Sequence, residues 1–160
     1  MKASKQSLMQ LATLCAFIVS SSPSFAQSSA EHDKWLKEQF SEKHQQITPI
    51  VAVADMFYAC NKVRKVDPIG YQFKDLVNKM DKNQLAEKLL LCLGEDTLQS
   101  EVALNFGLLG CFENQLLSLS KAARKEKMQQ VKETMLSLSR EERQKSFTKC
   151  VTSQAIKFIQ

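Results

Sequence analysis

Glycine and proline are scarce in this chain, with four and three among 160 residues. Sandwiches and barrels of short strands need many tight turns, and these two residues supply most of the backbone conformations that tight turns require. Leucine, lysine, glutamine, alanine and glutamate, which favour helices, are abundant instead. No alternation of polar and apolar residues persists long enough to indicate a strand. The composition therefore predicts an all-α fold.

Motifs of catalysis and of cofactor binding are also missing from the sequence. It has no G-x-S-x-G nucleophile elbow, no phosphate-binding glycine loop and no H-E-x-x-H zinc helix. The only two histidines, His32 and His44, stand upstream of four cysteines, and no two cysteines have C-x-x-C spacing. We therefore assign no catalytic, cofactor-binding or metal-binding residue, and we expect a protein that is not an enzyme and has no cofactor.

Long apolar runs are missing except for one near the start of the chain. The run from Leu8 to Val19 follows Lys2 and Lys5, and Ser24-Phe25-Ala26 then places small residues at the minus-three and minus-one positions of a cleavage site. These are the features of a signal peptide, residues 1–26, cleaved after Ala26. About 12 residues of helix span about 18 Å, too little to cross a hydrocarbon core of roughly 30 Å. The sequence thus predicts that this is a periplasmic or secreted protein with no membrane span after cleavage.

The predicted mature chain, residues 27–160, has a suitable size for one domain with one core. Because the leader carries Lys2 and Lys5 and no acidic residue, cleavage lowers the formal charge from +5 to +3. Nucleic-acid binding needs a strong basic stripe, which this small surplus does not supply. We expect no nucleic-acid partner.

Five cysteines are present, and Cys15 lies within the predicted leader. The other four lie in apolar stripes of predicted helices: Cys60, Cys92, Cys111 and Cys150. An even number of cysteines in an exported protein favours disulfides over reactive thiols or metal ligands. Of the three possible pairings we prefer Cys60 with Cys92 and Cys111 with Cys150, since the first pair would join the helices that flank the turn at Pro68 and Gly70 and the second would join the central helix to the last helix.

Apolar residues recur at three- and four-residue steps along most of the mature chain, which predicts a single compact bundle of six to seven helices. One helix is expected from Glu31 to Thr48 and another from Pro49, because the residue before a proline is disfavoured in a helix. The further helices are expected over 73–80, 82–93, 97–119, 121–138 and 140–158, with a loop over 66–70.

Several single residues carry more specific expectations. Asp81 is predicted to cap one helix, Gly94 to end it, and Ser139 to begin the last helix with a capping box. Gly107 and Gly110 indicate either a close neighbouring backbone or a kink in a central helix. Asp55 interrupts a strongly apolar run, and we expect it to face solvent.

The run Lys121 to Lys127, KAARKEK, is expected to form a solvated helix face; the alternative is a surface for lipid headgroups or an acidic protein. Together these features favour an exported, non-enzymatic protein that binds another protein of the cell envelope, as a chaperone, an assembly factor or an inhibitor or immunity protein. The alternative is a carrier of an apolar small molecule in a cavity among Met and Phe side chains. An enzyme without a recognisable motif is the third possibility.

Overall fold

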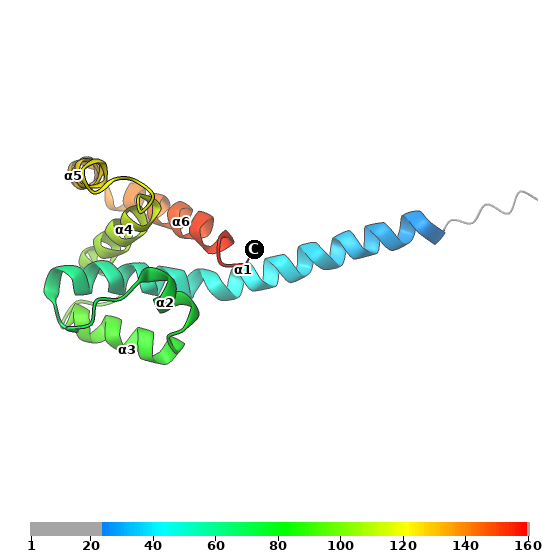
Figure 1. The fold of residues 1–160 in the computed structure, drawn as a ribbon, viewed down its shortest axis with the longest axis horizontal. Helices are drawn as coiled ribbons and strands as arrows, with labels where there is room; N and C mark the ends of the chain where they lie inside the picture. The colour runs from blue at the N-terminus through cyan, green and yellow to red at the C-terminus, as the bar shows by residue number, and fades with distance from the viewer. Residues whose placement is uncertain (1–23, 160) are drawn as a thin grey trace, which may run out of the picture. The chain divides into compact units, whose positions relative to one another are not determined.

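The computed structural model describes residues 24–159, with side chains described from residue 31 onward. Six α-helices and no strand occur in this range: α1 Ser24–Arg64, α2 Phe73–Asn78, α3 Lys82–Leu93, α4 Glu101–Gln115, α5 Lys121–Ser137 and α6 Arg140–Ile156 (Figure 1). The predicted all-α fold is confirmed.

The chain divides into two units, Met1–Trp35 and Leu36–Gln160. The described part of the first unit is the start of α1, where the rings of His32 and Trp35 stack with centroids 6.0 Å apart. Most of the predicted leader, residues 1–23, lies outside the described residues, so the signal peptide and its cleavage after Ala26 remain predictions. None of the helices between residues 24 and 159 has the length and apolar character that a membrane crossing requires.

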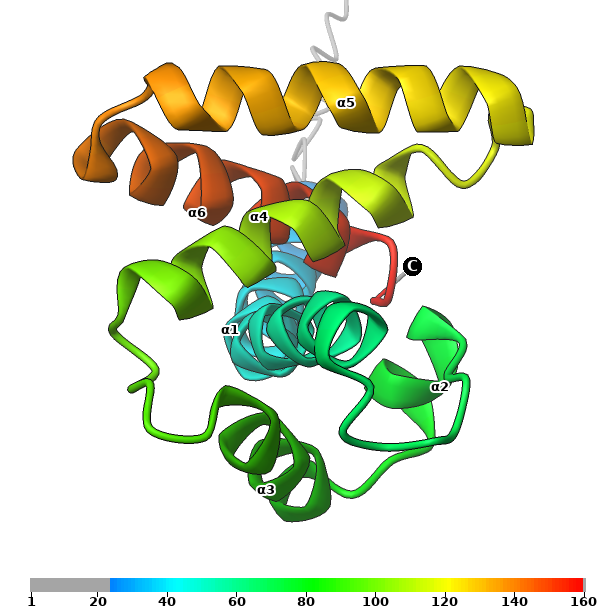
Figure 2. The ribbon, with the colours of Figure 1, turned by 90° about the vertical axis from the view of Figure 1, so that its left-hand side faces the viewer.

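In the second unit, the C-terminal half of α1 lies between two groups of helices (Figure 2). Helices α2 and α3 lie on one side of it, and α4, α5 and α6 lie on the other. The largest fully buried apolar side chains come from both groups and from α1: Phe57, Leu76, Leu85, Leu89, Leu93 and Leu108. One core therefore joins the two groups of helices through α1.

Two disulfides join helices within these groups. Cys60 on α1 is bonded to Cys92 on α3, and Cys111 on α4 is bonded to Cys150 on α6, with Cα atoms 6.2 and 6.3 Å apart. All four cysteines are buried. The predicted pairing is confirmed, and the two bonds indicate an oxidising environment outside the cytoplasm.

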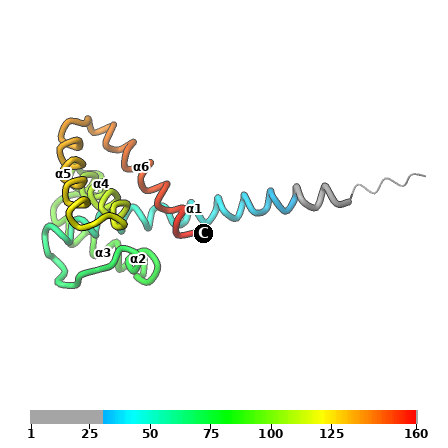
Figure 3. The backbone as a smooth tube through the Cα atoms, turned by 45° about the horizontal axis from the view of Figure 1, so that its top comes forward, coloured from blue at the N-terminus to red at the C-terminus, as the bar shows by residue number. Residues whose placement is uncertain are grey.

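The predicted break at Pro49 is wrong, because α1 continues through it. A proline inside a helix removes one backbone hydrogen bond and costs about 3 kcal/mol, but contacts on both sides of Pro49 offset this cost. Upstream, His44 Nε2 lies 3.2 Å from the carbonyl oxygen of Thr152 on α6, which returns to α1 (Figure 3). Downstream, Ile50 and Val51 pack into the core.

Helix α4 is shorter than predicted at both ends. Asp96, just before the predicted start, pairs with Arg64 at 2.9 Å, and the Ser100 side chain accepts the backbone N–H of Ala103 to cap the helix. The helix runs without interruption through Gly107 and Gly110. A Cβ at Gly110 would collide with the backbone carbonyl of Asp55 on α1, so close approach, and not a kink, explains this glycine.

The predicted capping residues are confirmed. Asp81 accepts the backbone N–H groups of Asn83 and Gln84 at the start of α3, and Gly94 ends α3 with φ of 65°. Ser139 and Glu142 form the predicted capping box at the start of α6. These local signals set the positions along α3 and α6 at which Cys92 and Cys150 face the core.

Candidate functional site

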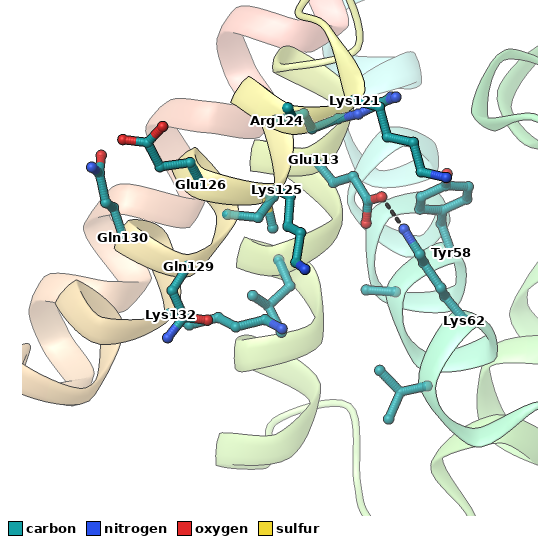
Figure 4. Close-up of a pocket in the computed structure, with 15 residues that line it drawn as sticks. Tyr58, Lys62, Glu113, Lys121, Arg124, Lys125, Glu126, Gln129, Gln130 and Lys132 are labelled. Carbon is teal, nitrogen blue, oxygen red and sulfur yellow. Dashed lines mark hydrogen bonds and ion pairs between the residues drawn. The ribbon is translucent and has the colours of Figure 1, made fainter.

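A groove of about 1190 Å³ lies between α1, α4 and α5 in the second unit (Figure 4). Helix α1 contributes Tyr58, Ala59, Lys62 and Val63, and α4 contributes Leu109 and Glu113; α5 contributes nine residues of the segment 121–132. The groove is larger than the hollow of about 260 Å³ beside Tyr71 and the one of about 290 Å³ beside Val131. Each of its two inner helices is joined by a disulfide to a helix outside the groove, α1 to α3 and α4 to α6.

Cationic side chains of α5 dominate the rim of the groove. Lys121, Arg124, Lys125 and Lys132 all line it, and none of them has an ion-pair partner within residues 31–159. Lys121 and Tyr58 point toward one another, whereas the carboxylate of Glu126 points away from both (Figure 4). Because Glu126 is the one acid of α5 that lines the groove, the four cations leave the rim with a surplus of positive charge.

The wall opposite α5 holds one ion pair. Lys62 on α1 pairs with Glu113 on α4, so the charge of this acid is already neutralised (Figure 4). Burial raises the pKa of the Tyr58 phenol, and the charge of Glu113 raises it further. Tyr58 is therefore an uncharged hydrogen-bond donor with an apolar ring at neutral pH.

Helix α5 stands apart from the core, which is why the groove exists. Its sequence from Lys121 to Ser137 is rich in lysine, glutamine and glutamate, and Met135 is its only buried residue. The Ser120 side chain caps it by accepting the N–H of Ala123. On the other side of α5 a smaller apolar slot of about 290 Å³ separates it from α4 and α6, with Phe112 and Val131 in its lining. Helix α5 thus has hollows on both sides.

Asp55 is the residue whose predicted position is wrong. It is fully buried on α1, where Oδ1 accepts a hydrogen bond of 3.3 Å from Gln154 Nε2 on α6. Its Oδ2 has no partner among the described residues. Desolvation raises the pKa of this carboxyl well above its ordinary value, and the hydrogen bond from Gln154 opposes the shift only in part. Asp55 faces the seam between α1 and α6, not solvent.

The residues singled out from the sequence end up in different places. The four cysteines form disulfides below the groove, and Gln154 Oε1 lies 2.8 Å from Sγ of Cys111. His44 contacts the backbone of Thr152, and no group of three or more His, Cys, Asp or Glu within the described range could hold a metal ion. Of the basic run, Lys121, Arg124 and Lys125 line the groove.

The floor and inner wall of the groove could not be recognised in the sequence. Lys62 and Glu113 are 51 residues apart, and nothing in either segment marks them as partners. Leu109 and Met128 fit the apolar periodicity of their helices, which predicts core positions. The only usable signal was the basic run, which identifies α5 as a candidate surface without identifying the helices opposite it.

Comparison with known proteins gives no further guide to this groove: no family model, curated protein or solved structure matches the chain.

Proposed function

We propose that this protein is an exported, non-enzymatic binding protein of the periplasm or the extracellular space, and that it holds a partner protein in the groove between α1, α4 and α5. The observation that carries the proposal is the combination of apolar residues on α1 and α4, each of which a disulfide joins to another helix, with a cationic rim on α5. A site that is already organised loses little conformational entropy when a partner binds. A chaperone, an assembly factor and an inhibitor or immunity protein all fit this description.

Site-specific photocrosslinking tests the proposal. Gln129 is exposed and lines the groove, whereas Gln144 is exposed on α6 outside it. A photoreactive residue at position 129, introduced into the protein in its own cells, should give a discrete protein adduct that position 144 does not give. The adduct should weaken when K125E/K132E reverses two rim charges. Equal adducts at both positions, or none at 129, would contradict the proposal.

Export is tested separately by the N-terminus of the protein recovered from outside the cytoplasm. The signal-peptide prediction expects the chain to begin at Gln27. Edman degradation or intact mass would reveal this start, and a full-length chain beginning at Met1 would contradict it. The two disulfides support export, because such bonds persist in oxidising compartments.

A second candidate function is transport of a small apolar molecule in the slot between α4, α5 and α6. Its lining is largely apolar, with Leu108, Phe112, Leu116, Val131 and Met135. Its volume of about 290 Å³ lies at the lower end of ligand sites, so a small compound is expected. Native mass spectrometry of freshly purified protein should then reveal bound ligand, and a bare mass would count against this function.

A further inference from the structure

The charge along the groove is mainly positive. Five cations line it: Lys62, Lys121, Arg124, Lys125 and Lys132. Of the two acids that line it, Glu113 is paired with Lys62, and the carboxylate of Glu126 points away from Lys121 and Tyr58 (Figure 4). A ligand that enters the groove therefore meets four cations of α5 that have no ion-pair partner within residues 31–159. Electrostatic complementarity requires negative charge on the side of that ligand that faces α5.

The floor of the groove is apolar. Ala59 and Val63 lie one turn apart on α1, Leu109 lies on α4, and Met128 on α5. Val63 is 65% exposed, so apolar surface is open to a ligand. The flexible thioether of Met128 can adapt to side chains of different shapes. The floor therefore requires an apolar strip on the ligand, next to its negatively charged side.

The size of the groove favours a helical peptide over a small molecule. Small-molecule sites occupy roughly 300–1,000 Å³ and enclose most of their ligand, whereas this groove has about 1190 Å³ and opens along α5. With a diameter of about 10–12 Å, a helix that fills this volume has about two to three turns. A flat membrane surface fits less well, because residues of three helices line a groove and a flat surface would meet only its outer parts.

We infer that the groove binds two to three turns of an acidic amphipathic helix from the partner protein. Apolar side chains of that helix contact Leu109 and Met128, and glutamate or aspartate side chains beside them pair with Lys121, Lys125 and Lys132 of α5. This inference rests on the proposed function and specifies the chemistry of the partner. The arrangement is that of a helix seated in a groove between other helices.

Binding of designed peptides to the disulfide-bonded mature protein tests the inference. The probe is a fluorescein-labelled helical peptide with leucines on one face and glutamates on both flanks. One matched peptide has lysine in place of every glutamate, and another has the same composition in an order that is not amphipathic. We expect only the acidic amphipathic peptide to bind, with an affinity that falls as salt is added, because exposed charges are screened.

Two protein variants with the same change in charge locate the binding. K125E/K132E reverses two exposed rim cations, and K82E/K149E reverses two exposed lysines outside the groove. The first variant should weaken binding of the acidic peptide by about tenfold or more, and the second should leave it within about twofold. Thermal unfolding of both variants verifies that the fold is retained.

Four outcomes would overturn the inference: equal binding of the lysine peptide, equal binding of the reordered peptide, equal loss in the two variants, or no binding of any peptide. Binding to vesicles with anionic lipid, without binding of the acidic peptide, would overturn it in favour of a membrane surface. The photocrosslink at Gln129 separates this inference from the proposed function. If that adduct persists when the acidic peptide fails, a partner of other chemistry occupies the groove.

Discussion

The two halves of the second unit, α1 to α3 and α4 to α6, have the same disulfide pattern but differ in how deeply their middle helix is buried. In the first half a disulfide joins α1 to α3, and in the second half a disulfide joins α4 to α6. In each half, the residue that caps the helix with the second cysteine precedes that cysteine by the same number of residues. Asp81 precedes Cys92 on α3, and Ser139 precedes Cys150 on α6. The middle helices of the two halves, α2 and α5, differ in burial. Three of the six residues of α2 are buried, whereas α5 has 17 residues and one of them is buried.

The connection before α2 is also held more tightly than α5. Asn61 accepts the backbone N–H of Asp67 at 2.8 Å and donates to its carbonyl at 3.0 Å, while the carboxylate of Asp67 binds Lys88 and the Tyr71 hydroxyl. The first half is therefore closed by its middle helix and loop. The second half leaves its middle helix at the surface, and the groove results from this difference.

Removing the disulfides gives the largest expected effect and tests how alike the halves are. The pairs Cys60→Ala/Cys92→Ala and Cys111→Ala/Cys150→Ala should each lower the free energy of unfolding by about 2–5 kcal/mol. Because the sequence separations are 32 and 39 residues, loop-closure entropy differs little between them. Urea denaturation of the three proteins measures both losses. A large loss for one pair and none for the other would show that the two connections are not equivalent.

Truncation of the two middle helices tests the contrast between them. Leu76 on α2 is fully buried, so Leu76→Ala should cost about 2–5 kcal/mol of stability. Met128 on α5 lines the groove and is partly exposed, so Met128→Ala should cost less than about 1 kcal/mol. Thermal or urea unfolding gives both values. Similar losses would mean that α5 is as well packed as α2, and the contrast would fail.

A methyl group at Gly110 tests the contact between the halves, since α4 meets α1 there. Gly110→Ala would press its Cβ against the Asp55 carbonyl, a rigid backbone group, and should cost about 1–3 kcal/mol or more. The matched control is Gly70→Ala, which meets no atom within 4 Å and should leave stability nearly unchanged. Calorimetry compares the two proteins. A wild-type melting temperature for Gly110→Ala would show that the two halves are not tightly apposed at this point.

The smallest effect concerns the pH dependence of two carboxyl groups. The folded state raises the pKa of Asp55, so it binds the proton more tightly than the unfolded chain, and stability falls as pH rises above 3.8. Asp55→Asn should flatten that fall. Hydrogen bonds from Lys88, the Ile69 amide and Tyr71 lower the pKa of Asp67 to about 2, so its contribution is present above pH 3.8 and is lost as pH falls toward 2. Melting temperatures from pH 2 to 8 should show opposite signs for Asp55→Asn and Asp67→Asn.

Most of the helices and both disulfides could be predicted because their signals are local. Asp81, Gly94 and the Ser139 capping box each act within a few residues of their position, and the apolar stripes place the cysteines on inward faces. Each disulfide joins two of these cysteines that are consecutive in the chain, with one helix, α2 or α5, between the bonded helices. The wrong predictions for Pro49 and Asp55 concern residues whose environment is set by distant parts of the chain.

Pro49 and Asp55 show why local rules fail there. The segment before Pro49 is held through His44 and the carbonyl of Thr152, 108 residues away, and Asp55 is bonded to Gln154, 99 residues away. No sequence pattern near either residue indicates that α6 packs beside it. The groove has the same character, since its basic rim is one run of sequence but its floor comes from three helices.

The order of the cysteines also bears on how the chain can be oxidised. Each disulfide joins cysteines that are consecutive from Cys60 onward, so the first bond can form without Cys111 or Cys150. If the thiols pair in chain order from Cys60, the native bonds form directly, and no exchange step is needed to correct them. The two loops neither enclose nor cross each other along the chain. Oxidation in that order therefore requires an electron acceptor for the thiols and no rearrangement of disulfides.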